Sequence, residues 1–281
     1  MNLSHLRRVA LFSLDILIAL SVAIFCGSLF WEFSTEQYLS GFADAIVPAG
    51  ASQTEKATAI LDWIAGGPAR SADADPDPLF DRDPRSTLNY RGLLNTCGTA
   101  TNAFVNLARR GGLRARRLLL FDGRGNTTHV VAEVKIQGQW IVVDPLFHFI
   151  ARDASGRLLT REDLKDPQVL RQATAGVRNY LAAYSYASTG HVRLARVPLI
   201  GSFLQDSVAR TSRGGISDWD WTLPLERESF AAVVVSFATI FLALAFRKIV
   251  RLVLRSQFRP LSESLPAPIS SGSPAVLVHN Q

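Results

Sequence analysis

A β-hairpin is predicted by the run His129-Val130-Val131-Ala132-Glu133-Val134-Lys135-Ile136-Gln137-Gly138-Gln139-Trp140-Ile141-Val142-Val143-Asp144. The dipeptide Gln137-Gly138 suits a two-residue turn between the two strands. This turn pairs Ile136 with Gln139 and places Asp144 opposite Val131. His129 and Asp144 then lie on the same face as diagonal neighbours, which is close enough for their side chains to meet.

The two faces of the first strand differ in composition. One face is wholly apolar, and we expect it to form the core: Val130, Ala132, Val134 and Ile136. The other face, on which His129 lies, is less apolar: His129, Val131, Glu133 and Lys135. A shift of one residue in the pairing would separate His129 from Asp144.

A helix is expected from about Gly98 to Arg110, before Gly111-Gly112, and Cys97 lies at its amino-terminal turn. The unpaired N–H groups and the dipole of this turn favour a thiolate and lower the pKa of the thiol. The same N–H groups could stabilise the oxyanion of a tetrahedral intermediate. Candidates for a second oxyanion donor precede the cysteine: Tyr90, Asn95 and Thr96.

Cys97, His129 and Asp144 together have the composition of a nucleophile, its base and the group that orients the base. Each residue alone would more often be structural. Their combination, with both strand residues on one face, favours a catalytic set. Other histidines compete as the base: His148, His191 and His5.

The flanking sequence predicts further elements. A strand is expected at 116–121, and Ser52-Gln53-Thr54-Glu55 forms a capping box before a helix that ends near Gly66. Residues 68–88 read as a loop and residues 160–175 as one helix, whereas 176–228 show no clear pattern.

Two segments are apolar enough to span a bilayer, Val9 to Trp31 and Ser229 to Phe246. Basic residues stand before the first and after the second, so the positive-inside rule places both termini in the cytoplasm. A cleaved signal peptide is the alternative for the first segment, although its apolar run is longer than is usual for one. Asp15 lies within this segment, either as a functional acid or as a solvated or helix-paired carboxylate.

The resulting division of the chain has five parts. They are a cytoplasmic 1–8, a transmembrane 9–31, an extracytoplasmic domain 32–228, a transmembrane 229–246, and a cytoplasmic basic helix with a disordered tail at 247–281.

The net charge of +6 does not indicate a nucleic-acid partner. Residues 32–228 carry a net charge of only +1, and the excess lies beside the two apolar segments. We see no metal-ligand cluster, phosphate loop or dinucleotide fingerprint in the sequence, so we expect no cofactor and no metal. Cys26 lies in the first apolar segment, which leaves Cys97 as the one cysteine of the extracytoplasmic domain.

Residues 95–145 resemble the transglutaminase-like superfamily, which is related in architecture to the papain-like cysteine proteases. The resemblance is carried by the Thr96-Cys97-Gly98 helix start, the Arg109-to-Arg116 exit, the His129 strand and Trp140-to-Pro145, with a fitting helix at 60–64. It implies an α+β fold with the cysteine helix packed on an antiparallel sheet. It also implies a triad of Cys97, His129 and Asp144.

The resemblance and the triad favour a membrane-anchored amide hydrolase, peptidase or acyltransferase that forms a thioester and acts on a peptide or protein. The alternative is a non-catalytic binding or scaffold module in cell-envelope or exopolysaccharide assembly. The Ala- and Arg-rich composition is consistent with a bacterium, and we therefore expect the domain in the periplasm, anchored in the inner membrane. Val131 departs from the family pattern, in which an aromatic residue often stands two positions after the histidine.

Overall fold

The computed structural model describes residues 3–66, 83–89, 93–94, 96–181, 183–192, 220 and 222–257. The chain forms two compact units. One combines Met1–Leu20 with Ala238–Gln281, and the other is Ser21–Phe237. The larger unit contains the sheet and all three residues of the predicted triad.

The larger unit is built on a five-stranded antiparallel sheet with the strand order β4-β3-β2-β1-β5. The strands are β1 (Ala115–Phe121), β2 (Thr127–Ile136), β3 (Gln139–Asp144), β4 (Phe149–Ile150) and β5 (Thr189–Gly190). The predicted hairpin is confirmed as β2 and β3, with Ile136 paired with Gln139. Gln137 and Gly138 both have positive φ, 49° and 85°, as a two-residue turn with the twist of a hairpin requires.

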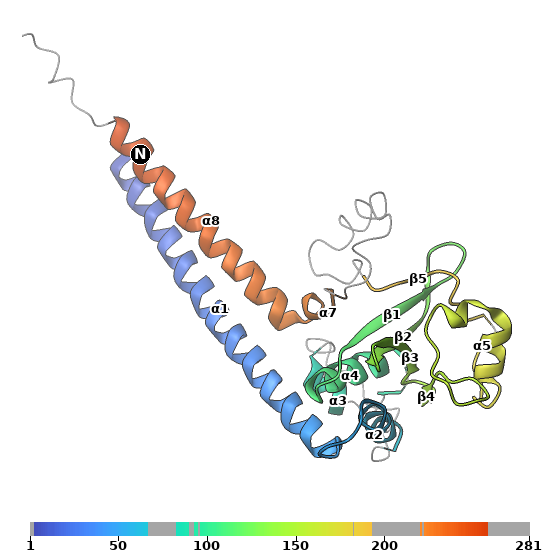
Figure 1. The fold of residues 1–281 in the computed structure, drawn as a ribbon. Helices are drawn as coiled ribbons and strands as arrows, with labels where there is room; N and C mark the ends of the chain where they lie inside the picture. Colours follow the sequence, from blue (N-terminus) through green and yellow to red (C-terminus); the bar gives the residue numbers. More distant parts are fainter. Residues whose placement is uncertain are drawn as a thin grey trace, which may run out of the picture. The chain divides into compact units, whose positions relative to one another are not determined.

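Helices cover both faces of this sheet (Figure 1). On one side are α2 (Gln53–Gly66), α3 (Pro84–Asn89) and α4 (Cys97–Arg110), and on the other is α5 (Pro167–Thr174). The predicted capping box starts α2, because the N–H of Ser52 donates to Glu55 (2.8 Å) and the N–H of Glu55 donates to Ser52 (3.3 Å).

The first core lies between the sheet and α2 and α4. It contains the expected apolar face of β2, with Ala132, Val134 and Ile136 all at most 1% exposed. The buried stripe of α4 packs against this face through Ala103, Phe104 and Leu107. The predicted α+β fold class, with the cysteine helix on an antiparallel sheet, is therefore confirmed.

The less apolar face of β2 is buried as well, at His129, Val131 and Glu133. Val131 belongs to a second core with Leu118 and Leu120 of β1. Segments far along the chain close this core, among them Leu159, Leu164 and Tyr186. The strand composition cannot show this cover, because the covering residues come from other parts of the sequence.

Two local predictions need correction. Residues 84–88 are not loop, because α3 occupies Pro84–Asn89; residues 67–82 lie outside the described part of the chain. The single helix expected at 160–175 is instead a 3₁₀ turn, Asp163–Lys165, followed by α5. The break has a clear cause: Asp166 caps α5 and Pro167, which lacks an N–H, occupies its first turn.

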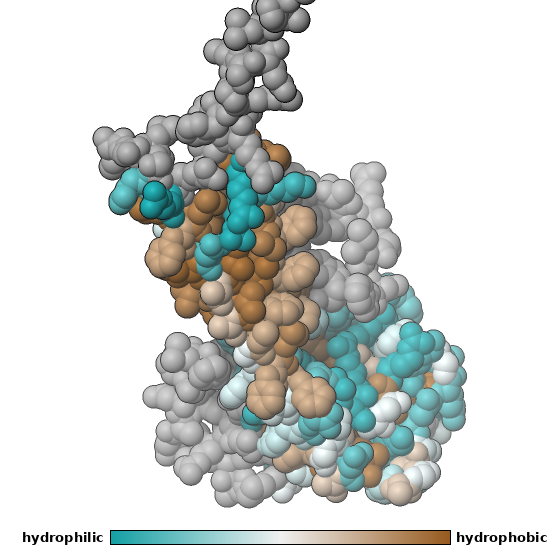
Figure 2. Space-filling view, turned by 90° about the vertical axis from the view of Figure 1, so that its left-hand side faces the viewer, coloured by the Kyte–Doolittle hydropathy of each residue, from teal (hydrophilic) through white to brown (hydrophobic). Residues whose placement is uncertain are grey.

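The two longest helices are α1 (Leu3–Ile46) and α8 (Glu228–Gln257), and both are long and apolar enough to cross a membrane. The first is one continuous helix, which runs beyond the apolar segment that ends at Trp31 as far as Ile46. Large apolar side chains are exposed on both helices, and Figure 2 shows them gathered as a brown region. The 3₁₀ turn and the short helix α7 (Thr222–Leu225) complete the elements of the described residues.

Candidate active site

Cys97 is the first residue of α4, one position earlier than the sequence suggested. Thr96 caps the helix by accepting a hydrogen bond from the N–H of Thr99 (3.3 Å). The hydroxyl of Thr101 donates to the carbonyl of Val130 (2.9 Å). This hydrogen bond attaches the amino-terminal part of α4 to β2, next to His129. The helix start and the histidine strand are therefore held together.

His129 and Asp144 meet as the predicted register requires. Nε2 of His129 donates to Oδ2 of Asp144 at 2.6 Å, and both side chains are fully buried. The other carboxylate oxygen accepts a hydrogen bond from the N–H of Leu146 (3.1 Å). Because both oxygens are held, Asp144 fixes the orientation of the imidazole and places the proton on Nε2.

The second ring nitrogen of His129 is directed to a different partner. Nδ1 is buried and has no hydrogen bond to a nitrogen or oxygen of the described residues. Its interaction with the thiol of Cys97 is one of the influences on the pKa of both groups. The imidazole thus links the thiol to the carboxylate, with one nitrogen for each.

The pKa values of His129 and Cys97 are shifted in the directions that favour an ion pair between the two side chains. Burial alone would lower the pKa of His129, but hydrogen bonds to Asp144 and Cys97, with their charges, raise it to about 9. Burial would raise the pKa of the Cys97 thiol, but the hydrogen bond and charge of His129 and the N–H of Val130 lower it below its ordinary value. Both shifts favour a thiolate beside an imidazolium.

Three aromatic side chains that were not predicted from the sequence surround the ring of His129. Tyr184 stacks on the imidazole with ring centroids 4.1 Å apart and an angle of 4° between the planes. Phe147 and Tyr180 approach it edge-on, with centroids at 5.8 and 6.3 Å. Phe147 follows β3 directly, whereas Tyr180 and Tyr184 reach the site through the path of the chain after α5. No short-range pattern in the sequence marks these three residues.

The competing histidines have other partners. His148 is exposed and pairs with Asp62 (2.7 Å), whereas His191 is buried and pairs with Glu133 (2.8 Å). His5 is exposed in the other compact unit. Of the three suggested oxyanion donors, Thr96 uses its side chain as the helix cap, and Tyr90 and Asn95 lie outside the described residues.

A buried network of charged side chains connects α4 to β1 and to the segment before α8. The sequence pattern did not predict this network. Arg117 of β1 is 1% exposed and donates to both oxygens of Asp220 (2.9 and 3.0 Å). It also donates to Glu226 at 2.9 Å and to Asn102 of α4 at 3.4 Å. The segment before α8 is therefore part of the support for α4.

A second arginine, Arg227, also donates a hydrogen bond to an asparagine of α4, one helical turn after the asparagine that Arg117 contacts. Arg227 donates to Asn106 (3.1 Å) and, on its other side, to Glu32 and Glu36 of α1 (3.0 and 3.3 Å). Together the two arginines join α4 to β1, to the lower part of α1 and to the start of α8.

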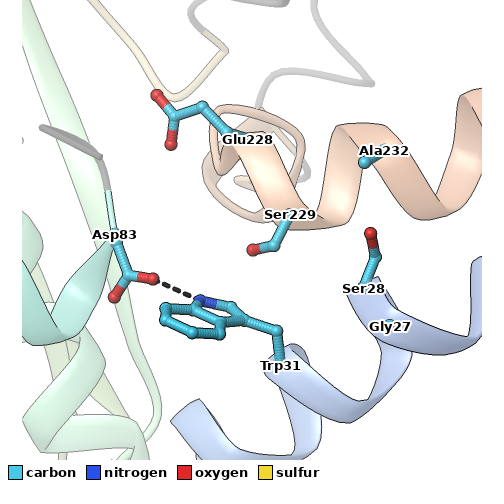
Figure 3. Close-up of a pocket in the computed structure, with 7 residues that line it drawn as sticks. All are labelled: Gly27, Ser28, Trp31, Asp83, Glu228, Ser229 and Ala232. Carbon is cyan, nitrogen blue, oxygen red and sulfur yellow. Dashed lines mark hydrogen bonds between the residues drawn. The ribbon is translucent and has the colours of Figure 1, made fainter. Parts of the chain in front are cut away.

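A cavity of about 340 Å³ lies between α1, the start of α8 and the residue before α3 (Figure 3). The indole ring of Trp31 extends from α1 and donates to Asp83 at 2.6 Å. The lining residues are Gly27, Ser28, Trp31, Asp83, Glu228, Ser229 and Ala232. None of the predicted triad residues lines this cavity, and we assign its Trp31–Asp83 contact to the attachment of α3 to α1.

Metal binding was not expected from the sequence. In the parts of the chain that the structure describes, no three His, Cys, Asp or Glu side chains are grouped so as to hold a metal ion.

Residues 40–145 match the family model described as the transglutaminase-like superfamily. No curated protein and no solved structure matches the chain. The matched segment includes α2, α4 and β1 to β3, together with Cys97, His129 and Asp144. Over these residues the chain is similar to the transglutaminase-like superfamily, and the α+β architecture of α4 and the sheet agrees with that match.

Proposed function

We propose that this protein is a membrane-anchored cysteine hydrolase or acyltransferase that acts on amide bonds. The superfamily includes cysteine hydrolases and acyltransferases as well as non-catalytic members. The observation that favours an enzyme is the arrangement of His129, which bonds to Asp144 through Nε2 and turns its other nitrogen to Cys97. A binding module has no need for a buried, ionised base beside a cysteine.

The proposed reaction begins at the thiolate. Cys97 attacks the carbonyl carbon of an amide, and a tetrahedral oxyanion forms. The first-turn N–H groups of Cys97 and Gly98 have no carbonyl one turn earlier to bond to within α4, so they are suited to stabilise this charge. His129 gives its proton to the departing amine, which leaves an acyl thioester on Cys97.

The second half of the reaction returns the enzyme to its starting state. His129, now neutral, takes a proton from water or from a primary amine, which attacks the thioester carbon. Water gives hydrolysis and an amine gives acyl transfer; in both cases the thiolate leaves and the ion pair with His129 is restored. Asp144 remains ionised throughout and keeps the ring in place.

The proposed location is a membrane with both termini on its cytoplasmic side. Support comes from the exposed apolar surfaces of α1 and α8, on which Phe30 is 72% and Phe241 67% exposed. Basic residues at Arg8 and Arg247 flank the apolar parts on the same side. Asp15 forms an ion pair with Arg247 (2.8 Å), which favours the interpretation of a helix-paired carboxylate.

The test of the proposed activity is labelling of Cys97 in the full-length protein with iodoacetamide, followed by peptide mapping. We expect labelling near neutral pH in the wild type and none at this position in Cys97→Ala. Asp144→Asn should remain labelled but should cleave an amide substrate slowly, because Asp144 orients the base without touching sulfur.

An unlabelled wild type would contradict the enzyme proposal and favour the alternative of a non-catalytic module in envelope or polysaccharide assembly. Hydrolysis and acyl transfer are then distinguished by adding a primary amine and identifying the product by mass.

A further inference from the structure

The second face of the sheet carries a groove of about 410 Å³ beside the proposed active site. It is formed by α5, by the 3₁₀ turn before it and by the segment that contains Tyr180 and Tyr184. These elements lie after residue 145 and so outside the segment that matches the superfamily. The groove is therefore a feature of this chain rather than of the matched domain.

Tyr184 connects the groove to the site. One ring lines the groove and also stacks on His129 at 4.1 Å. Burial raises the pKa of the Tyr184 hydroxyl, and the nearby charges of Cys97 and Asp144 raise it further. Because Tyr184 belongs to both, the groove adjoins the imidazole of His129.

The charged side chains that line the groove are all positive. Lys165 and Arg171 contribute positive charge, and none of the described lining residues is an acid. Lys165 already pairs with the exposed Glu162 (2.6 Å), whereas Arg171 is exposed and has no hydrogen bond or ion pair within the described residues. Arg171 is therefore the cation that remains available.

The acidic side chains near the groove already accept hydrogen bonds from groups that do not line it. Asp163 accepts bonds from Thr160 and Arg157, and Asp166 caps α5 by accepting from the N–H of Gln168 (2.7 Å). The apolar part of the lining includes Leu164, Pro167 and Leu170. An apolar floor with one free guanidinium matches a side chain that has methylene groups and ends in a carboxylate.

We propose that this groove binds an acidic residue of a peptide substrate, with Arg171 as the residue that recognises its carboxylate. This inference rests on the proposed function, since it assigns a specificity to the same reactive cysteine. The recognised class is a peptide with a glutamyl-type side chain near the amide that reacts.

The test uses three peptidyl chloromethyl ketones that differ only in the residue next to the reactive group: glutamyl, glutaminyl or lysyl. Each forms a thioether with Cys97 and releases chloride, so the alkylation rate reports recognition without a known substrate. We expect the glutamyl compound to react with the wild type about tenfold faster than the glutaminyl one, as a charge-assisted hydrogen bond would give.

Arg171→Gln should remove this preference, Arg171→Glu should favour the lysyl compound, and Arg171→Lys should retain part of the glutamyl preference. Arg178→Glu is the matched control, because Arg178 is also exposed, follows α5 and does not line the groove. It should keep the wild-type order of rates.

Two results would overturn the inference while leaving the proposed function intact. One is equal rates for the glutamyl and glutaminyl compounds in a wild type that iodoacetamide labels at Cys97. The other is a glutamyl preference that Arg171→Glu does not change. Failure of iodoacetamide itself to label Cys97 would reject the proposed function and this inference together.

Discussion

His129 is the residue on which the proposed chemistry depends, because its two nitrogens have different partners. Asp144 holds one nitrogen at 2.6 Å, and the other is left to Cys97. Burial opposes a charge on the ring, yet the two acidic partners outweigh it. A pKa of about 9 keeps the imidazole protonated at neutral pH, as the proposed role of His129 as an acid requires.

A pH profile should reveal this charged pair. Because the pKa of Cys97 is lowered, its alkylation by iodoacetamide should rise with pH below the ordinary thiol range of about 8.5. Amide cleavage should then fall as pH rises through about 9, where His129 loses the proton that it must donate. His129→Ala should move the alkylation profile up toward 8.5, and an unchanged profile would make Cys97 a structural cysteine.

The stacked ring of Tyr184 should stabilise the positive charge on the imidazole of His129. A cation on an aromatic face gains about 0.5–2 kcal/mol, which corresponds to roughly half a pH unit to one and a half. We expect Tyr184→Ala to lower the upper pH limit of amide cleavage by that amount, since the pKa of His129 falls. Tyr184→Phe keeps the ring and should keep the limit, so equal shifts in both variants would contradict a role of the stacking.

At the scale of elements, the three long strands β1 to β3 and the helix α4 were predictable because their signals are local. Gln137-Gly138 defines the hairpin turn, and this turn determines that His129 and Asp144 share a face. The continuity of α1 and the break at Pro167 were missed. The first depends on helix formation beyond the apolar run, and the second on a cap at Asp166 that overrides the helical pattern.

The parts that could not be predicted involve contacts over long sequence distances. Tyr184 reaches His129 from 55 positions away in the chain, and Asp220 reaches Arg117 from 103. A buried arginine in a strand looks in the sequence like an exposed one until its partners are known. The cover on the second face of the sheet was hidden for the same reason.

The network around Arg117 should make a large contribution to stability. Arg117→Met leaves Asp220 and Glu226 buried without their partner, and we expect a loss of about 3–5 kcal/mol in the free energy of unfolding. Urea denaturation of the detergent-solubilised protein measures this loss. Arg114→Met is the matched control at an exposed position just before β1 and should stay within about 0.5 kcal/mol of the wild type. Similar losses in both variants would argue against a special role of the network.

At the scale of the whole molecule, the proposed topology requires the two ends of the chain and the domain to lie on opposite sides of a membrane. Reporter fusions at Gly156 and at Gln281 should therefore give opposite readings. Gly156 lies in an exposed turn, so an insertion there should leave the sheet intact. The same reading at both positions would reject the topology.

The pairing of Arg117 with Asp220 and Glu226 also has a consequence for biogenesis. During translation β1 leaves the ribosome about a hundred residues before its counter-ions are made, so its guanidinium cannot be neutralised by them until the start of α8 has been synthesised. The domain is therefore completed only after the segment directly before α8 has emerged. An expression fragment cut to residues 40–145 would lack both acids and would expose an unfinished core to aggregation.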